Sequence, residues 1–216
     1  MKKILRFARK NWRIILVVVV LLVAGFGFWL LKHSDQKKIQ QKKNEVITYS
    51  PDKPDETKPD KDTYKWFGND DDPKYITLPS IKAEGFLRKV GVDQNKQVAT
   101  PDNINMAGWF VDTVRPGQKG NSIIDGHVSG WVNNGIFKDL IKMKAGDIYT
   151  VEFGNGDKKE FKVKEVKDVP VADAASVLFS QDPEITNQLS LITCGGKFNR
   201  STNQYENRVI VISQAM

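Results

Sequence analysis

This chain of 216 residues has one cysteine, Cys194, and two histidines, so it offers few candidates for a nucleophile and its base. A thiol with a reference pKa of about 8.5 is mostly protonated at neutral pH, so a reactive cysteine needs a neighbouring base or cation. Cys194 ends the apolar run "QLSLITC" and precedes two glycines, which indicates a junction between a strand and a loop. The other interpretation is an inert buried thiol, since free cysteine often packs as a small core hydrophobe.

Only one of the two histidines can serve this thiol. His33 follows the hydrophobic run of residues 14–31 by two positions, which places it far from a distal domain. His127 follows "SIIDG" and therefore also lies at the end of a predicted strand. Two strand ends from separate parts of the chain can meet at one rim of a barrel, although a purely structural histidine fits the same pattern.

An arginine could complete the site. A negative charge that develops on a substrate carbonyl oxygen needs a donor, and the planar guanidinium is a double donor that stays ionised. Two arginines follow the cysteine: Arg200 in the next loop and Arg208 at the start of "RVIVIS". If the last two strands are neighbours, Arg208 is held on rigid backbone beside Cys194. For each arginine, a surface cation is the alternative.

The elements that must position these residues are mostly strands. From Tyr75 onward, short apolar or alternating segments recur between turn signals, which is typical of an all-β domain. Seven or eight strands with few helices suit a closed or nearly closed barrel. A short helix is predicted over 135–147, and 173–180 fits either helix or loop. The predicted strands fall within 75–81, 85–92, 107–114, 122–128, 148–153, 159–171, 188–194 and 208–213.

The N-terminal part predicts a membrane anchor. Residues 14–31 are eighteen uncharged, almost wholly apolar residues, just long enough at about 1.5 Å per residue to cross a hydrocarbon core of about 30 Å. A cleaved signal peptide is the alternative, but no small-residue cleavage site follows the run. The basic residues before the span favour a cytoplasmic tail over 1–13, which puts the folded domain outside the cell.

The distribution of charge argues against a nucleic-acid partner. The chain carries +7 overall, but residues 1–43 hold eleven basic residues against one acid, whereas residues 74–216 are close to neutral. The excess therefore surrounds the apolar span, where it attracts anionic lipid. Residues 32–73 are polar and Pro-punctuated, which predicts a disordered extracellular linker before a folded domain over 74–216. The acidic run Asn69–Asp72 is interpreted as solvated linker, and no metal site is predicted.

At these residues the sequence resembles the sortase family, in particular its class F, with classes D and E close. "LSLITC" is similar to the sortase signature TLxTC, with Ser190 in place of its first threonine, and "IIDGHV" is similar to the segment that carries the sortase histidine. The similarity extends over "ITLPSI", "GWFVDTVRPGQKGNSIIDGHV", "GIFKDLIKMKAGD" and "LITCGGKFNRSTNQY…VIVIS", and thus over residues 75–213.

This resemblance implies an eight-stranded β-barrel with one or two short helices, following the transmembrane helix. It implies a cysteine transpeptidase that cleaves an LPXTG-like sorting signal between Thr and Gly and transfers the acyl group to an amine of a peptidoglycan precursor, without a cofactor. Cys194 would be the nucleophile, His127 the proton-transfer residue and Arg208 the oxyanion donor, with Thr193 and Arg200 assigned to substrate binding.

Two other function classes remain open from the sequence. An L,D-transpeptidase also pairs cysteine with histidine outside the cell, but those enzymes resemble a His-Gly-Cys-Arg arrangement, and no histidine lies near Cys194. A tethered, non-catalytic β-domain that binds cell-wall polymer or a surface protein would need no reactive thiol. Labelling of Cys194 by a thiol-directed reagent would separate this class from the enzymes.

Overall fold

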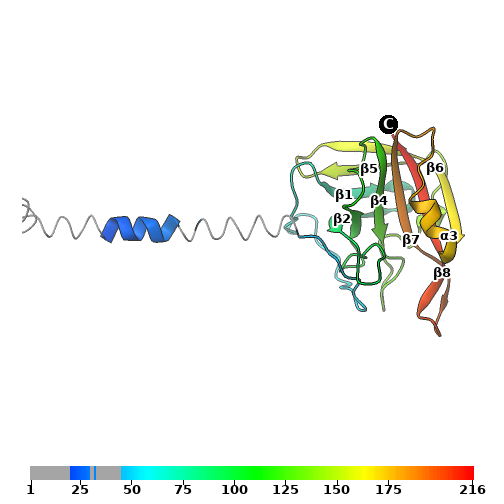
Figure 1. Ribbon diagram of the computed structural model, residues 1–216, viewed down its shortest axis with the longest axis horizontal. Helices are drawn as coiled ribbons and strands as arrows, with labels where there is room; N and C mark the ends of the chain where they lie inside the picture. Colours follow the sequence, from blue (N-terminus) through cyan, green and yellow to red (C-terminus); the bar gives the residue numbers. More distant parts are fainter. Residues whose placement is uncertain (1–19, 30–31, 33–44) are drawn as a thin grey trace, which may run out of the picture. The chain divides into compact units, whose positions relative to one another are not determined.

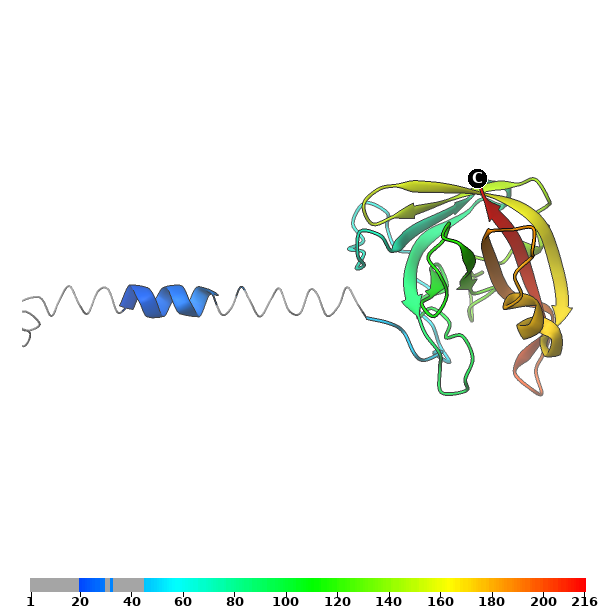
Figure 2. The ribbon, with the colours of Figure 1, turned by 45° about the horizontal axis from the view of Figure 1, so that its top comes forward.

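Eight strands form a closed barrel in the order β1-β2-β3-β4-β7-β8-β6-β5 in the computed structural model, which describes residues 20–29, 32 and 45–216 (Figures 1 and 2). Neighbouring strands are antiparallel except for the pairs β2/β3 and β4/β7, which are parallel. The predicted all-β barrel is thus confirmed. The strands are β1 (Pro73–Leu78), β2 (Ala83–Val90), β3 (Ala107–Phe110), β4 (Gly120–Gly126), β5 (Ile148–Phe153), β6 (Lys158–Pro170), β7 (Asn187–Asn199) and β8 (Gln204–Ala215).

Helical structure in the barrel unit is limited to short pieces. The α-helix α3 (Val171–Leu178) packs against β8 and β6 (Figure 1). Two 3₁₀ turns, η1 (Pro79–Ile81) and η2 (Leu140–Lys142), complete the set. The helix predicted over 135–147 is therefore reduced to the single turn η2, because its apolar side chains fold into the barrel core from a series of turns.

Two apolar clusters lie on opposite sides of the same strands. The first fills the barrel interior and includes Leu191 and Val211; the second lies outside it, beneath α3, and includes Ile192 and Ile210. Successive side chains of a strand point to opposite faces, so β7 and β8 are buried on both faces. This burial explains why "LSLIT" and "VIVI" are continuous apolar runs rather than alternating ones.

The residues before β1 include an N-terminal strap, residues 45–66, that contacts the barrel. Ile47 is buried in the outer cluster and forms a β-bridge with Val90. Trp66 donates its indole N–H to the Leu87 carbonyl at 2.9 Å. The prediction of a disordered linker over 32–73 was therefore wrong for these residues. The prediction failed because the strap is polar, and backbone groups of the barrel supply most of its hydrogen-bond partners.

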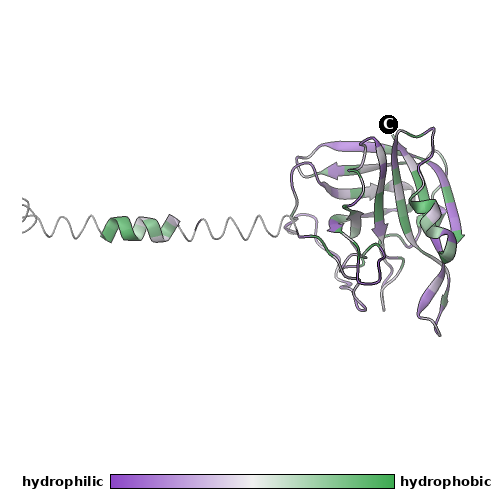
Figure 3. Cartoon of the chain, viewed as in Figure 1, coloured by the Kyte–Doolittle hydropathy of each residue, from purple (hydrophilic) through white to green (hydrophobic). Residues whose placement is uncertain are grey.

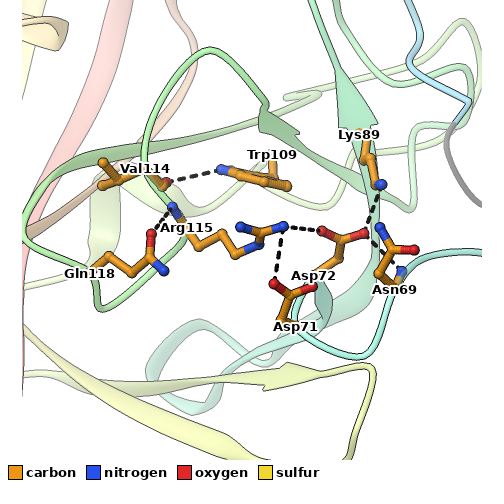
Figure 4. A network of polar contacts seen from close by, with 8 residues as sticks. All are labelled: Asn69, Asp71, Asp72, Lys89, Trp109, Val114, Arg115 and Gln118. Carbon is orange, nitrogen blue, oxygen red and sulfur yellow. Dashed lines mark hydrogen bonds and ion pairs between the residues drawn. The ribbon is translucent and has the colours of Figure 1, made fainter.

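The acidic run before β1 is also structural rather than solvated. Asp72 is buried, and its carboxylate accepts an ion pair from Lys89 at 2.7 Å and a longer one from Arg115 at 3.4 Å (Figure 4). The backbone N–H of Asn69 donates to the same carboxylate at 2.8 Å, and Asp71 pairs with Arg115 at 3.1 Å. We call these five residues the Asp72 network. It lies at the end of the barrel where β3 turns into β4.

The N-terminal unit, Met1–Lys43, is described only in part. Residues 20–29 form a helix of mostly apolar, exposed side chains (Figure 3), and the remainder of the predicted span over 14–31 lies outside the described residues. In the described ranges, no helix combines the length and the apolar character that crossing a bilayer requires.

Candidate active site

Strand register brings Cys194 and Arg208 together. The two residues are direct cross-strand partners in the antiparallel pair β7/β8, and partners in such a pair point to the same face. By alternation from Ile192 and Ile210, that face is the outer one, at the edge of the second apolar cluster. Arg200 lies instead in the exposed turn that joins the two strands, in a hairpin that extends beyond the barrel in both ribbon views (Figures 1 and 2).

His127 arrives at the same rim from β4. This strand runs parallel to β7, and the last paired positions are Asp125 and Ile192. His127 and Cys194 each lie two residues beyond that pair; His127 directly follows β4, whereas Cys194 lies within β7, which continues to Asn199. The register thus places the two residues on neighbouring strands, as the sequence suggested. The prediction that Cys194 ends a strand is wrong, because β7 continues past the glycines into its hairpin with β8.

Thr193 links β7 to β4 next to Cys194 and His127. Its side chain is buried, and its hydroxyl donates to the Gly126 carbonyl at 2.6 Å. This bond ties β7, one residue before Cys194, to β4, one residue before His127. Thr193 is buried, and its assignment to substrate binding stays a prediction.

The glycines after Cys194 accommodate an irregularity in the pairing of β7 with β8. Pairing between β7 and β8 shifts register between Gly195 and Phe198, and Gly196 has a φ of +71°, a left-handed conformation that favours glycine. A Cβ on Gly195 would approach the Val209 side chain to 2.8 Å. The backbone at Gly195 therefore lies close to β8.

A backbone carbonyl fixes the orientation of the His127 ring. Nε2 lies 2.7 Å from the carbonyl oxygen of Pro101, in the loop between β2 and β3. A carbonyl can only accept, so Nε2 carries the proton, and Nδ1 is the nitrogen left to exchange a proton in the neutral ring. Burial lowers the pKa of His127, and the bond to Pro101 raises it in part, so the neutral form predominates at neutral pH.

The electrostatics at this rim involve a residue that sequence reasoning missed. Burial raises the pKa of the Cys194 thiol; the Arg208 cation opposes this rise, and the Asp125 carboxylate adds to it. Burial also raises the pKa of Asp125 itself to about 7, against a bond from the Gly126 N–H and the charge of Arg208. A signal was present in the sequence: Asp125 is two residues before His127 and so shares its face of the strand.

Arg208 is available for a ligand. Its Nη1 donates to the backbone carbonyls of Asn207 at 2.9 Å and Tyr205 at 3.5 Å. Within the described part of the chain, no carboxylate lies within ion-pair distance of this guanidinium. A guanidinium that is held by backbone carbonyls and has no carboxylate at ion-pair distance can meet a developing oxyanion. The described residues include no group of acidic, histidine or cysteine side chains that could hold a metal ion.

Comparison with known proteins agrees with this fold. The family model described as Sortase domain matches residues 76–216. No curated protein matches the chain in sequence.

Solved structures share the same fold. Sortase A from Corynebacterium diphtheriae superposes with a TM-score of 0.51 at 21% identity, covering 69% of this chain and 62% of that one. A lid mutant of the same enzyme gives 0.50 at 23% identity, with 67% and 69% covered. Sortase C1 from Streptococcus agalactiae, in complex with MTSET, gives 0.50 at 17% identity, with 66% of each chain covered. In the first of these superpositions, this chain covers somewhat less than two thirds of the length of the C. diphtheriae sortase A.

Proposed function

The chain belongs to the sortase family of cysteine transpeptidases, and on that premise we propose that it cleaves an LPXTG-like sorting signal between Thr and Gly and transfers the acyl group to an amine of a cell-wall precursor. The observation that carries the proposal is the register: Cys194 lies directly across from Arg208, and His127 ends the strand on the other side of β7. Nucleophile, oxyanion donor and proton-transfer group thus lie on adjacent strands.

The first half of the reaction transfers the acyl group to the enzyme. The Cys194 sulfur attacks the Thr carbonyl carbon while its proton moves to Nδ1 of His127. Arg208 donates to the carbonyl oxygen as it becomes negative. The C–N bond to Gly then breaks, and Nδ1 returns the proton to the departing amine. A thioester between the Thr carbonyl and Cys194 remains.

The second half repeats these roles in reverse. The amine of the precursor attacks the thioester carbon and gives a proton to Nδ1, and the C–S bond breaks. The proton then returns to the thiolate of Cys194. Because burial holds the thiol pKa high, thiolate is a good base and regains its proton readily. Water in place of the amine would give hydrolysis by the same steps.

We also propose the surroundings of this reaction. The apolar residues 14–31 would anchor the chain in the lipid bilayer with residues 1–13 in the cytoplasm, so that the barrel meets its substrates outside the cell. The class F assignment rests on the ordered set of four segments, from "ITLPSI" to "VIVIS", across residues 75–213. Arg200, in the exposed turn beyond the site, would contact the substrate away from the scissile bond.

The test uses the full chain in detergent with a quenched LPXTG-type peptide and an amine acceptor. We expect the Cys194→Ala and His127→Ala variants to lose turnover and the wild-type enzyme to form a thioacyl adduct visible by mass spectrometry. His33→Ala is the matched control, since it removes the chain's other imidazole, and it should retain full activity. Wild-type turnover in Cys194→Ala would refute the proposal.

A further inference from the structure

One residue of the N-terminal strap holds both loops that flank His127. The first is the β2–β3 loop, which supplies the Pro101 carbonyl for the imidazole. The second is the loop that begins at His127 itself and runs to residue 135. Glu56 contacts the first through its backbone and the second through its carboxylate.

The backbone side of this contact resembles a short two-stranded ladder. Asp55 forms a bridge with Asn103, donates its N–H to Asp102 at 2.8 Å and accepts the Ile104 N–H at 2.8 Å. The Glu56 carbonyl accepts from the Asn105 side chain at 3.0 Å. These bonds fix the strap against the four residues that follow Pro101.

The side-chain side is an anion cradle. The Glu56 carboxylate accepts the backbone N–H groups of three consecutive residues: Trp131, Val132 at 3.1 Å and Asn133 at 2.8 Å. The Asn133 side chain adds a fourth donor at 3.0 Å. Although burial alone would raise the pKa of Glu56, these donors lower it overall, so the carboxylate stays ionised at neutral pH. The carboxylate packs closely against the loop, since a Cβ added to Gly130 would lie 2.5 Å from it.

The cradled loop is connected directly to His127. The His127 carbonyl accepts the Phe137 N–H at 3.0 Å, and a Cβ on Gly135 would collide with that carbonyl. On its far side the loop reaches the β7–β8 hairpin, where the Ser129 and Tyr205 hydroxyls lie 2.9 Å apart. Movement of residues 130–133 would therefore be transmitted to the imidazole.

We propose that Glu56 is a positioning residue for His127, and that the N-terminal strap is thereby part of the machinery of this enzyme rather than a passive tether. The inference rests on the proposed role of His127 in proton transfer. Glu56 does not touch the reacting atoms. It acts by holding the imidazole in its buried place with Nε2 on the Pro101 carbonyl, which leaves Nδ1 for the thiol.

The experiment is an NMR titration of histidine Cε1–H signals in the full chain in detergent, with ¹³C-labelled histidine. The chain has only two histidines, and His33→Gln assigns the pair. Releasing the loop in Glu56→Ala should hydrate the imidazole and raise the midpoint of His127 toward its ordinary value, because burial is what lowers it. Loss of the Glu56 charge alone would act in the opposite direction, since a carboxylate favours imidazolium. Cys194, Arg208 and Asp125 face the ring's side of the site and are unchanged in the variant.

Graded variants and a matched control complete the design. Glu56→Gln keeps one accepting oxygen and should give an intermediate midpoint, and Asn133→Ala, which removes one donor, should give the smallest rise. Asp62→Asn removes an exposed carboxylate of the same strap and should leave the midpoint unchanged. In peptide turnover we expect Glu56→Ala to lose about 10- to 100-fold, mainly in kcat, as for a misplaced catalytic group.

An unchanged or lowered midpoint in Glu56→Ala, with shifted Trp131–Asn133 amide signals that prove the loop is released, would overturn the inference. If Glu56→Ala does not fold, the titration midpoint of His127 in Asn133→Ala decides in the same way. A raised midpoint in a chain that shows no transpeptidation would sustain the Glu56 inference and refute the proposed function, so the two can fail separately.

Discussion

At the end of the barrel where β3 turns into β4, Arg115 contacts two carboxylates, Asp71 at 3.1 Å and the buried Asp72 at 3.4 Å (Figure 4). At the opposite end, Arg208 contacts backbone carbonyls and, among the described residues, no carboxylate within ion-pair distance. The first arginine has its charge neutralised by the fold itself. The second is oriented by the fold but keeps its charge for a ligand. A guanidinium beside a thiol, with no carboxylate at ion-pair distance among the described residues, is what the proposed oxyanion role requires.

The largest expected effect separates these two arginines. Arg208→Ala should lower turnover of the sorting peptide by about 10²–10³-fold, the usual cost of a lost oxyanion donor, with little change in unfolding free energy. Arg115→Ala should do the reverse, since its guanidinium contacts only structural partners. Steady-state kinetics and urea unfolding of both variants measure this. Equal losses of turnover in the two would erase the distinction between the two ends.

The next effect concerns the Asp72 network alone. Asp72→Asn leaves Lys89 and Arg115 facing a neutral amide in a buried position, and breaking a buried pair in this way costs about 3–5 kcal/mol. We expect urea unfolding to show that loss, while kcat at a temperature where the variant is folded stays near the wild-type value. Asp62→Asn, an exposed strap carboxylate, is the control. A fully stable Asp72→Asn would mean that the network is not a stabilising element.

The two ends of the barrel differ in how much of their structure the sequence predicts. The site end was predictable because its residues carry chemical type: a single thiol, one usable imidazole and an arginine at the start of an apolar strand. The barrel was predictable from β-branched runs between turns. The Asp72 network was not, because four polar residues in a row look solvated unless the contacts of Asp72 with Lys89 and Arg115 are known. Pro101 and Glu56 were missed for a related reason, since a backbone carbonyl and a strap carboxylate act through tertiary contacts that leave no local pattern.

A smaller effect is expected from the hydrogen bond that links β7 to β4 at the site, between the Thr193 hydroxyl and the Gly126 carbonyl. Thr193→Val removes the bond to the Gly126 carbonyl and leaves that buried acceptor without its donor, at a cost of about 1–3 kcal/mol. Thr193→Ser keeps the hydroxyl and serves as the conservative control. Unfolding free energy should fall for Val and much less for Ser, with turnover affected only in proportion to any misplacement. A fully active and stable Thr193→Val would remove Thr193 from the support of the site.

The finest test reads the charge balance around the thiol. Asp125→Asn removes the negative charge that raises the pKa of Cys194 beside the larger effect of burial, so the thiol pKa should fall. The pH dependence of alkylation of Cys194 measures this directly. Because the pKa of Asp125 is raised to about 7, its carboxylate is charged only above that pH. The variant and the wild type should therefore differ in alkylation rate above pH 7 and converge below it.

The control variants change Arg208. Arg208→Lys, which keeps the positive charge, should leave the pH dependence of alkylation nearly unchanged, whereas Arg208→Ala should shift it in the opposite direction. A difference that persists undiminished well below pH 7 would show that Asp125 acts on the thiol through packing rather than through charge, and the electrostatic contrast between the two ends of the barrel would then rest on Arg208 alone.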